Sequence, residues 1–139
     1  MHLLTAPLRA RLLANGGAAA RRTPRHDPVP VVKLFNPLGP ATWLATELDT
    51  DGDTLFGLAD LGFGCPELGC FSLHEIAALR LPFGLRIERD LSFTTGAPLS
   101  GWINAARPTG SISAAETLLA RAGEGLRSHP LPRSDPDRG

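Results

Sequence analysis

The sequence predicts an α+β fold, with a small antiparallel sheet over about residues 29–93 that packs against an N-terminal helix and short C-terminal helices. Short β-branched and apolar runs recur in that region, and turns rich in Pro, Gly, Asn and Asp separate them. Helical spacing of apolar residues appears near both ends of the chain and in one short segment between strands. With 139 residues and 42% hydrophobic residues, the chain can bury one core, so we expect a single domain over residues 1–123.

The first helix is expected over residues 3–14, where leucines recur on one face. Thr5 can cap its N-terminus, and Pro7 falls in the first turn, where a missing N–H costs little. We expect Asn15, Gly16 and Gly17 to end it, because glycine commonly stops a helix.

Five stretches have the composition of strands: residues 29–35, 41–48, 54–61, 68–71 and 85–93. In the second stretch, alternation places Trp43 and Ala45 on one face with Glu47, and Leu48 on the other. In the last, apolar and polar residues alternate, which predicts a strand with one solvated face and with Arg89 on the apolar side.

Three shorter helices complete the prediction. Ser72 to Glu75 matches a capping box and opens a short helix. A weak helix is expected over residues 98–106, and a second capping box at Ser113 to Glu116 opens a helix that Gly123 ends. Pro, Ser, Arg and Asp dominate from residue 124 onward, so we predict a disordered tail over residues 124–139.

Charge is unevenly distributed although the formal net charge is zero. Residues 1–33 hold six basic residues against one acidic residue, whereas residues 34–79 hold seven acidic residues and no Lys or Arg. Such asymmetry concerns partners and solubility rather than fold, and mutual neutralisation of the two parts is the plainer interpretation. The basic loop with Arg21, Arg22 and Arg25 could contact nucleic-acid phosphates.

The cellular setting is predicted from segments that the sequence lacks. No apolar run approaches the length of a membrane span, and the first residues do not match a secretory signal, so we expect no membrane partner. Two cysteines, Cys65 and Cys70, are too few for a disulfide framework. A cytoplasmic location is the simplest expectation.

Two residue groups invite a metal-site interpretation, and neither fits well. Asp49, Asp51 and Asp53 alternate like calcium ligands, but Thr54 stands where a calcium loop needs Gly. We therefore interpret them as a solvated hairpin turn. Cys65, Cys70 and His74 lack a fourth ligand and a standard zinc spacing, so we expect Cys70 to be a small buried side chain. No metal, cofactor or catalytic residue is predicted.

Arg89 is the polar residue whose role is most open. If its guanidinium is buried, it needs a carboxylate, and Asp60 and Glu47 are candidates. We favour a structural ion pair over a functional arginine.

Several blocks together resemble one protein family. They are Pro30 to Pro37, Thr42 to Leu48, Phe56 to Gly62, Pro66 to Gly69, Phe71 to Glu75 and Ile87 to Asp90. Over about residues 3–112 the chain resembles a "domain of unknown function" family of small bacterial proteins carried on plasmids, conjugative elements and prophages. The resemblance implies a single-domain protein in a mobile-element setting and brings no catalytic residues. Cys70 departs from the family, which usually has an aromatic residue there.

Two functions of different classes follow. The leading one is a non-enzymatic binding module of mobile genetic elements, which engages a host or element protein and could interfere with a host defence system. Its expected contact residues are Asp49, Asp51, Asp53 and Arg89. The alternative is a nucleic-acid-associated accessory protein that uses Arg21, Arg22 and Arg25. A small metal-dependent enzyme is the third possibility.

Overall fold

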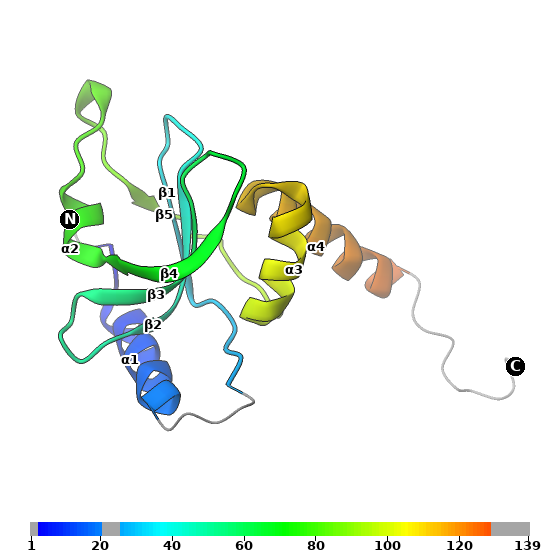
Figure 1. The fold of residues 1–139 in the computed structure, drawn as a ribbon, viewed down its shortest axis with the longest axis horizontal. Coiled ribbons are helices and arrows are strands. Elements are labelled where there is room, and N and C mark those ends of the chain that lie inside the picture. Colours follow the sequence, from blue (N-terminus) through cyan, green and yellow to red (C-terminus); the bar gives the residue numbers. More distant parts are fainter. Residues whose placement is uncertain (1–2, 21–25, 129–139) are drawn as a thin grey trace, which may run out of the picture.

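The computed structural model describes residues 3–20 and 26–128, without the side chains of 18–20 and 124–128. A five-stranded antiparallel sheet in the order β4-β3-β2-β1-β5 lies between two groups of helices, which confirms the predicted α+β fold (Figure 1). Its elements in chain order are α1 (Ala6–Ala20), β1 (Val32–Phe35), β2 (Thr42–Leu48), β3 (Thr54–Asp60), β4 (Glu67–Ser72), α2 (Leu73–Ala78), the short 3₁₀ turn η1 (Pro82–Gly84), β5 (Glu88–Arg89), α3 (Leu99–Thr109) and α4 (Ile112–Ser128).

Each face of the sheet has its own apolar core. On one face, α1 and α2 pack against strand residues such as Leu34 and Leu55, with Leu12 of α1 fully buried. On the other face, α3 and α4 cover Leu44 and Leu58, and Trp102 lies at the centre of that contact. Burial on both faces explains why β2 contains an almost continuous run of buried residues.

Helix α1 continues past the expected stop. Thr5 does cap it, because the Leu8 N–H donates to the Thr5 hydroxyl at 3.3 Å. The helix then runs through Gly16 and Gly17 to Ala20, so the prediction that these glycines end it was wrong. Gly16 lies so close to the sheet that a Cβ there would be 2.6 Å from the Leu48 carbonyl oxygen. The glycine therefore permits a close approach of helix and strand.

A β-bulge changes the faces of β2. The pairing with β3 shifts between Ala45 and Glu47, so Thr46 is the extra residue. After this bulge the alternation is inverted, and Leu48 joins Ala45 in the core beneath α1. The predicted grouping of Glu47 with Trp43 and Ala45 was therefore wrong.

The last strand is much shorter than predicted. Only Glu88 and Arg89 pair with β1, although a strand was expected over residues 85–93. Ile87 is buried, but Leu91 is 83% exposed, so the apolar residues of the alternating pattern do not share one buried face. The pattern correctly indicated extended backbone near β5 but overestimated its length.

Three helices begin at an aspartate that comes from a distant part of the chain. Asp53 accepts the His74 N–H in the first turn of α2 at 2.8 Å. Asp27 accepts the Ser100 N–H of α3 at 3.0 Å, and Asp60 accepts the Ile112 N–H of α4 at 2.9 Å. Because helix N-termini carry unpaired N–H groups and a positive partial charge, each carboxylate is well placed there.

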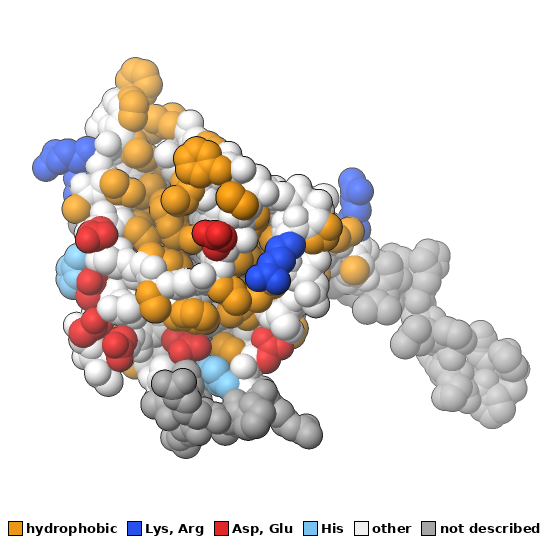
Figure 2. All heavy atoms as spheres, viewed as in Figure 1, with side chains coloured by type: hydrophobic (Ala, Val, Ile, Leu, Met, Phe, Trp, Pro, Cys, Tyr) orange, Lys and Arg blue, Asp and Glu red, His pale blue; other side chains and the backbone are white. Residues whose placement is uncertain are grey.

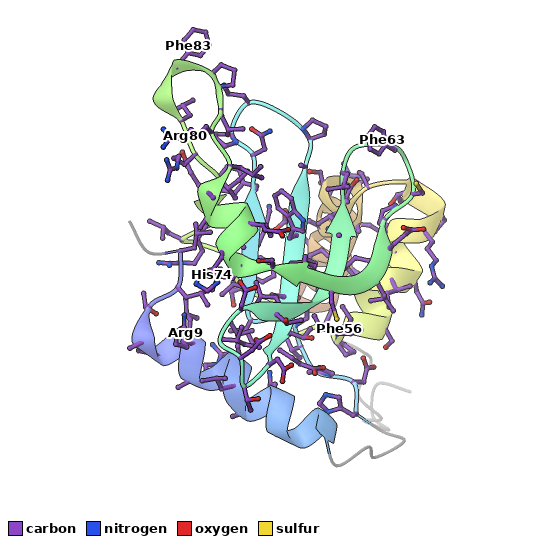
Figure 3. All side chains as sticks on the ribbon, turned by 60° about the vertical axis from the view of Figure 1, so that its left-hand side comes forward. Arg9, Phe56, Phe63, His74, Arg80 and Phe83 are labelled. Carbon is purple, nitrogen blue, oxygen red and sulfur yellow. The ribbon has the colours of Figure 1, made fainter. Side chains whose placement is uncertain are left out.

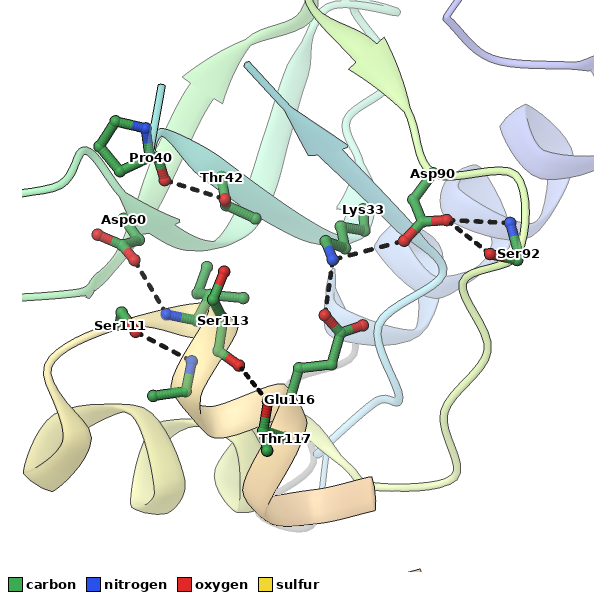
Figure 4. Close-up of polar contacts among 12 residues, drawn as sticks. Lys33, Pro40, Thr42, Asp60, Asp90, Ser92, Ser111, Ser113, Glu116 and Thr117 are labelled. Atoms are coloured by element: carbon green, nitrogen blue, oxygen red, sulfur yellow. Dashed lines mark hydrogen bonds and ion pairs between the residues drawn. The ribbon is translucent and has the colours of Figure 1, made fainter. Parts of the chain in front are cut away.

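Helix α4 also begins and ends elsewhere than predicted. Ser111 rather than Ser113 is its local cap, because the Ala114 N–H donates to the Ser111 hydroxyl. Glu116 instead pairs with Lys33 Nζ of β1 at 2.6 Å (Figure 4). The helix passes Gly123 and runs to Ser128, so the backbone of 124–128 is helical, and residues 129–139 of the predicted tail lie outside the described residues.

Candidate functional site

The acidic turn, Asp49 to Asp53, joins β2 and β3 and is folded by its own side chains. One Asp51 carboxylate oxygen accepts the N–H groups of Asp53 and Thr54, both at 2.8 Å, and the other accepts the Thr54 hydroxyl at 2.6 Å. The Thr54 hydroxyl, followed by these two N–H groups, lowers the pKa of Asp51. Asp49 and Asp51 are both exposed to solvent.

Asp53 faces the start of α2 rather than solvent alone. Its carboxylate accepts the Ser72 hydroxyl at 2.9 Å and the His74 N–H, and the His74 Nδ1 lies 2.6 Å away. The backbone N–H of His74 is the largest cause that lowers the pKa of Asp53. Asp53 thus has a structural role, and Figure 3 places His74 beside the turn at the surface.

These three side chains contain the residue types of a serine hydrolase triad in the wrong order. In such a triad, histidine lies between the serine and the carboxylate and takes the serine proton. Here the carboxylate of Asp53 lies between Ser72 and His74. His74 is 76% exposed, so its other ring nitrogen faces water. The arrangement caps a helix and provides no activated nucleophile.

The cysteines do not converge with His74. Cys65 and Cys70 are both free and exposed, so the expectation of a buried Cys70 was wrong: β4 is an edge strand and nothing covers its side chain enough to bury it. Within the described residues, no three His, Cys, Asp or Glu side chains gather in a way that could hold a metal ion.

Arg89 finds a carbonyl rather than a carboxylate. Its Nη1 donates to the Leu3 backbone oxygen at 2.5 Å, which ties β5 to the segment before α1. Its proposed partners are occupied elsewhere: Glu47 lies 3.2 Å from His26 Nε2, and Asp60 accepts the N–H groups of Ile112 and Gly62. The predicted ion pair was wrong: Arg89 is only half-buried, so the donors that do not bind the Leu3 carbonyl can bind water instead of a carboxylate.

The basic segment with Arg21, Arg22 and Arg25 lies outside the described residues. Its role in nucleic-acid binding therefore stays a prediction.

The most exposed aromatic side chains are ones that the sequence interpretation missed. Phe83 is 90% exposed and Phe63 is 81% exposed, and they lie on separate loops at the same end of the sheet (Figure 3). Leu61, two residues before Phe63, is also exposed, as is Leu68 of β4, and Figure 2 shows several apolar side chains at the surface of the face it draws. The Pro-Phe-Gly run was the available signal, since a bulky residue between turn formers is typical of a loop tip.

Two backbone hydrogen bonds close the Phe83 loop. The Leu81 N–H donates to the Leu85 carbonyl at 3.0 Å, and the Leu85 N–H donates to the Pro82 carbonyl at 3.3 Å. Phe83 itself has φ 64°, which is uncommon for a bulky residue. Arg80 and Arg86 are exposed on either side of this loop.

A cavity of about 310 Å³ opens beside the base of the Phe83 loop. We call it the β5 groove, and its lining includes Leu85, Arg86, Ile87, Arg89 and Leu91. Arg89 is thus both a structural residue and part of an accessible surface. The groove combines apolar walls with two arginines and Glu88, so it suits an apolar side chain that is flanked by polar groups.

Comparison with known proteins relates the chain to two curated enzymes over part of their length. It is 38% identical over 90 residues to a dihydroorotate dehydrogenase (quinone) of Herminiimonas arsenicoxydans, covering 63% of this chain and 25% of the enzyme. It is 43% identical over 70 residues to the same enzyme of Janthinobacterium sp. (strain Marseille), covering 49% of this chain and 19% of the enzyme. The chain spans a quarter or less of these relatives.

No solved structure matches this chain. In the described part, none of the helices has both the length and the apolar character that crossing a membrane requires. One family covers most of the chain, with a match over residues 3–113. The chain therefore belongs to the family described as "Protein of unknown function (DUF2958)".

Proposed function

We propose that the protein is a non-enzymatic binding module of mobile genetic elements that engages a protein of the host or of the element. The presentation of Phe83 is the observation that carries the proposal. An almost fully exposed phenyl ring stands at the tip of a hydrogen-bonded loop, on a residue with an unfavourable φ of 64°. Strain of this kind, when the fold does not need the side chain, points to function.

The surroundings of Phe83 match those of protein-binding surfaces. Interfaces are centred on a few aromatic and arginine side chains, with polar groups at the rim. Phe83 lies between the exposed Arg80 and Arg86, and the β5 groove lies at the base of its loop. The partner surface would offer an apolar pocket for the ring, an apolar side chain for the groove, and acceptors for the guanidinium groups.

The acidic turn supplies a second, weaker contact. Asp49 and Asp51 are exposed and could face a basic surface of the partner. Asp53 and Arg89 also have structural contacts, so their side chains are less free to serve a partner directly. We therefore place the binding energy at Phe83 and treat Asp49 and Asp51 as rim residues that affect the association rate.

Interference with a host defence system is one form that such binding would take. Its support is the resemblance to proteins of plasmids and prophages, which is an argument by association. A cytoplasmic location agrees with two exposed free thiols, since such thiols persist in reducing compartments.

A comparison of variants tests the proposal. Phe83→Gly removes the ring and relieves the positive φ, so the protein should remain folded and gain about 1 kcal/mol of stability. Cross-linking in host cells should capture specific proteins with the wild type, and these proteins should be absent from the captured set of Phe83→Gly. They should persist for Leu118→Ala, which removes a half-exposed leucine from α4.

Two results would count against the proposal. One is a wild type that captures the same proteins as an unrelated domain of equal size. The other is capture that Phe83→Gly leaves unchanged, which would move the binding surface away from this loop.

A further inference from the structure

The outer edge of β4 is an unpaired strand edge. In the sheet order β4-β3-β2-β1-β5, β4 has β3 on one side and, within residues 3–20 and 26–128, no strand on the other. Figure 1 places β4 at the front of the molecule, in the open. The opposite edge strand, β5, is only two residues long, whereas β4 has six. Among the described strands, β4 therefore offers the longer free edge.

Two hydrogen bonds fix which backbone groups point outward. The Asp49 N–H donates to the Thr54 carbonyl at 2.8 Å, so the backbone N–H and C=O of Thr54 point toward β2. Those of the next residue, Leu55, therefore point toward β4. The Leu73 N–H donates to the Asp53 carbonyl at 2.9 Å, in agreement. Phe71 is the partner of Leu55, so its backbone N–H and C=O point toward β3. Because these groups alternate in direction along an antiparallel strand, those of Gly69 point toward β3 as well. Leu68 and Cys70 then point their N–H and C=O groups into solvent.

This edge lacks the features that usually prevent strand pairing. Natural edge strands carry lysine, proline or a bulge, or they are very short. β4 has none of these within Glu67–Ser72, and its pairing with β3 shows no register shift. Its one charge is Glu67 at the first position. The four central residues, 68–71, are uncharged.

We propose that β4 pairs antiparallel with β4 of a second copy of this chain, about a two-fold axis at Cys70. A symmetric antiparallel pair centred on any residue sets outward residues against each other, and centring on Cys70 or Gly69, in the middle of β4, pairs the most residues of the strand. Centring on Cys70 places Phe71 opposite Gly69 of the other copy. A Cβ at Gly69 would meet nothing within 4 Å, so the phenyl ring has room to cover it.

The alternative register is less favourable. Centring on Gly69 would set the two glycines against each other and would place Glu67 opposite Phe71. The Cys70 register keeps the two Glu67 carboxylates at opposite ends of the paired strands, so like charges do not meet.

Whole-molecule charge also favours a second copy as the occupant. The formal net charge is zero, so two copies do not repel each other. This inference goes beyond the proposed partner binding and uses a different surface. Its failure would leave the Phe83 experiment untouched, and Phe83→Gly should leave self-association unchanged.

The two cysteines provide a matched cross-linking test in the full-length protein. Both thiols are free and exposed, so a difference between them reports proximity rather than access. With diamide as oxidant, Cys65→Ser, which keeps Cys70, should form a disulfide-linked dimer. Cys70→Ser, which keeps Cys65, should stay monomeric on a non-reducing gel. Equal cross-linking of both variants would overturn the proposed pairing.

Sedimentation velocity of the reduced protein gives a second test, from about 1 to about 200 μM. The wild type should form dimers within this range. Leu68→Lys places an amino group at the edge and should raise the dimer dissociation constant at least about tenfold, with an unchanged circular dichroism spectrum. Leu118→Lys, on the exposed face of α4, should have no effect. A wild type that stays monomeric, or a dimer weakened by Leu118→Lys and not by Leu68→Lys, would overturn the proposal.

Discussion

Single aspartates have large structural effects in this protein. Asp60 is 2% exposed, and its two oxygens accept the N–H groups of Gly62 and Ile112. One side chain thus closes the turn after β3 and caps α4, on which the second core depends. Composition alone would have assigned this residue to the acidic surface.

Replacement of Asp60 tests that role. Asp60→Ala should lower the free energy of unfolding by about 3 kcal/mol, because it removes a helix cap and leaves the buried Ile112 N–H unpaired. Urea unfolding followed by circular dichroism would measure the change. Asp49→Ala, at an exposed carboxylate in the acidic turn, should stay within about 0.5 kcal/mol of the wild type. Equal effects of the two substitutions would contradict the assignment.

The lowered pKa of Asp53 predicts a dependence of stability on pH. Hydrogen bonds from His74 and Ser72 favour the ionised carboxylate in the folded state. Its contribution is therefore fully present above the unfolded-state pKa of about 3.9 and is lost as pH falls through the lower folded-state pKa.

Asp53→Asn should flatten the loss of stability below about pH 4, because asparagine can still accept these hydrogen bonds but does not titrate. Urea unfolding at a series of pH values down to about pH 2 would measure the slope. Ser72→Ala should flatten the slope partly, since it removes one of the bonds to the carboxylate. An unchanged slope in Asp53→Asn would contradict the interpretation.

At the scale of elements, the glycine in α1 and the bulge in β2 belong to one helix–strand contact. Gly16 lets the helix approach the Leu48 carbonyl, and the Asn15 side chain donates to the Thr46 carbonyl at 2.9 Å. Thr46 is the bulge residue of β2. The bulge and the glycine-containing helix thus meet at one contact.

Neighbouring glycines in α1 should respond oppositely to alanine. Gly16→Ala should destabilise the protein by about 2 kcal/mol, because the new Cβ would lie 2.6 Å from a backbone oxygen. Gly17→Ala meets nothing within 4 Å and should stabilise the helix by about 1 kcal/mol. Thermal unfolding of the two variants would measure the difference, and shifts of the same sign would be unexpected.

Local sequence patterns predicted elements better than their ends. The turn at Asp49 to Asp53 and the capping serine Ser72 were both read correctly, since such signals act over a few residues. The length of α1 was not, because Gly16 has a tertiary reason to lie inside a helix. The bulge at Thr46 and the early end of β5 leave no mark in the alternation of apolar residues, which is the pattern that predicts strands.

The candidate site was harder to predict than the fold. Charged residues attracted attention in the sequence, yet Asp53 and Arg89 proved to hold neighbouring backbone groups. Phe83 was passed over because the Pro-Phe-Gly run indicates a turn but does not say whether its aromatic ring packs inward or stays exposed. Only the loop geometry identifies it as a candidate contact.

At the scale of the whole molecule, the uneven charge makes nucleic acid the alternative partner to test. The binding proposal expects no tight complex with DNA or RNA at physiological salt. Tight binding that falls steeply with salt and vanishes when Arg21, Arg22 and Arg25 become Ala would instead favour the nucleic-acid-associated alternative. Fluorescence anisotropy with a labelled duplex and a labelled single strand would measure both affinities. Arg80→Ala, in the Phe83 loop, is the control.

The remote aspartates have a consequence for how the chain folds. The bonds that start α2, α3 and α4 bridge 21, 73 and 52 residues of sequence. None of these helices can gain its carboxylate until the segment that carries it has been brought into place. Full capping of these helices is therefore conditional on long-range assembly, and the chain should cross its folding barrier in one concerted step, with few fully formed helices before it.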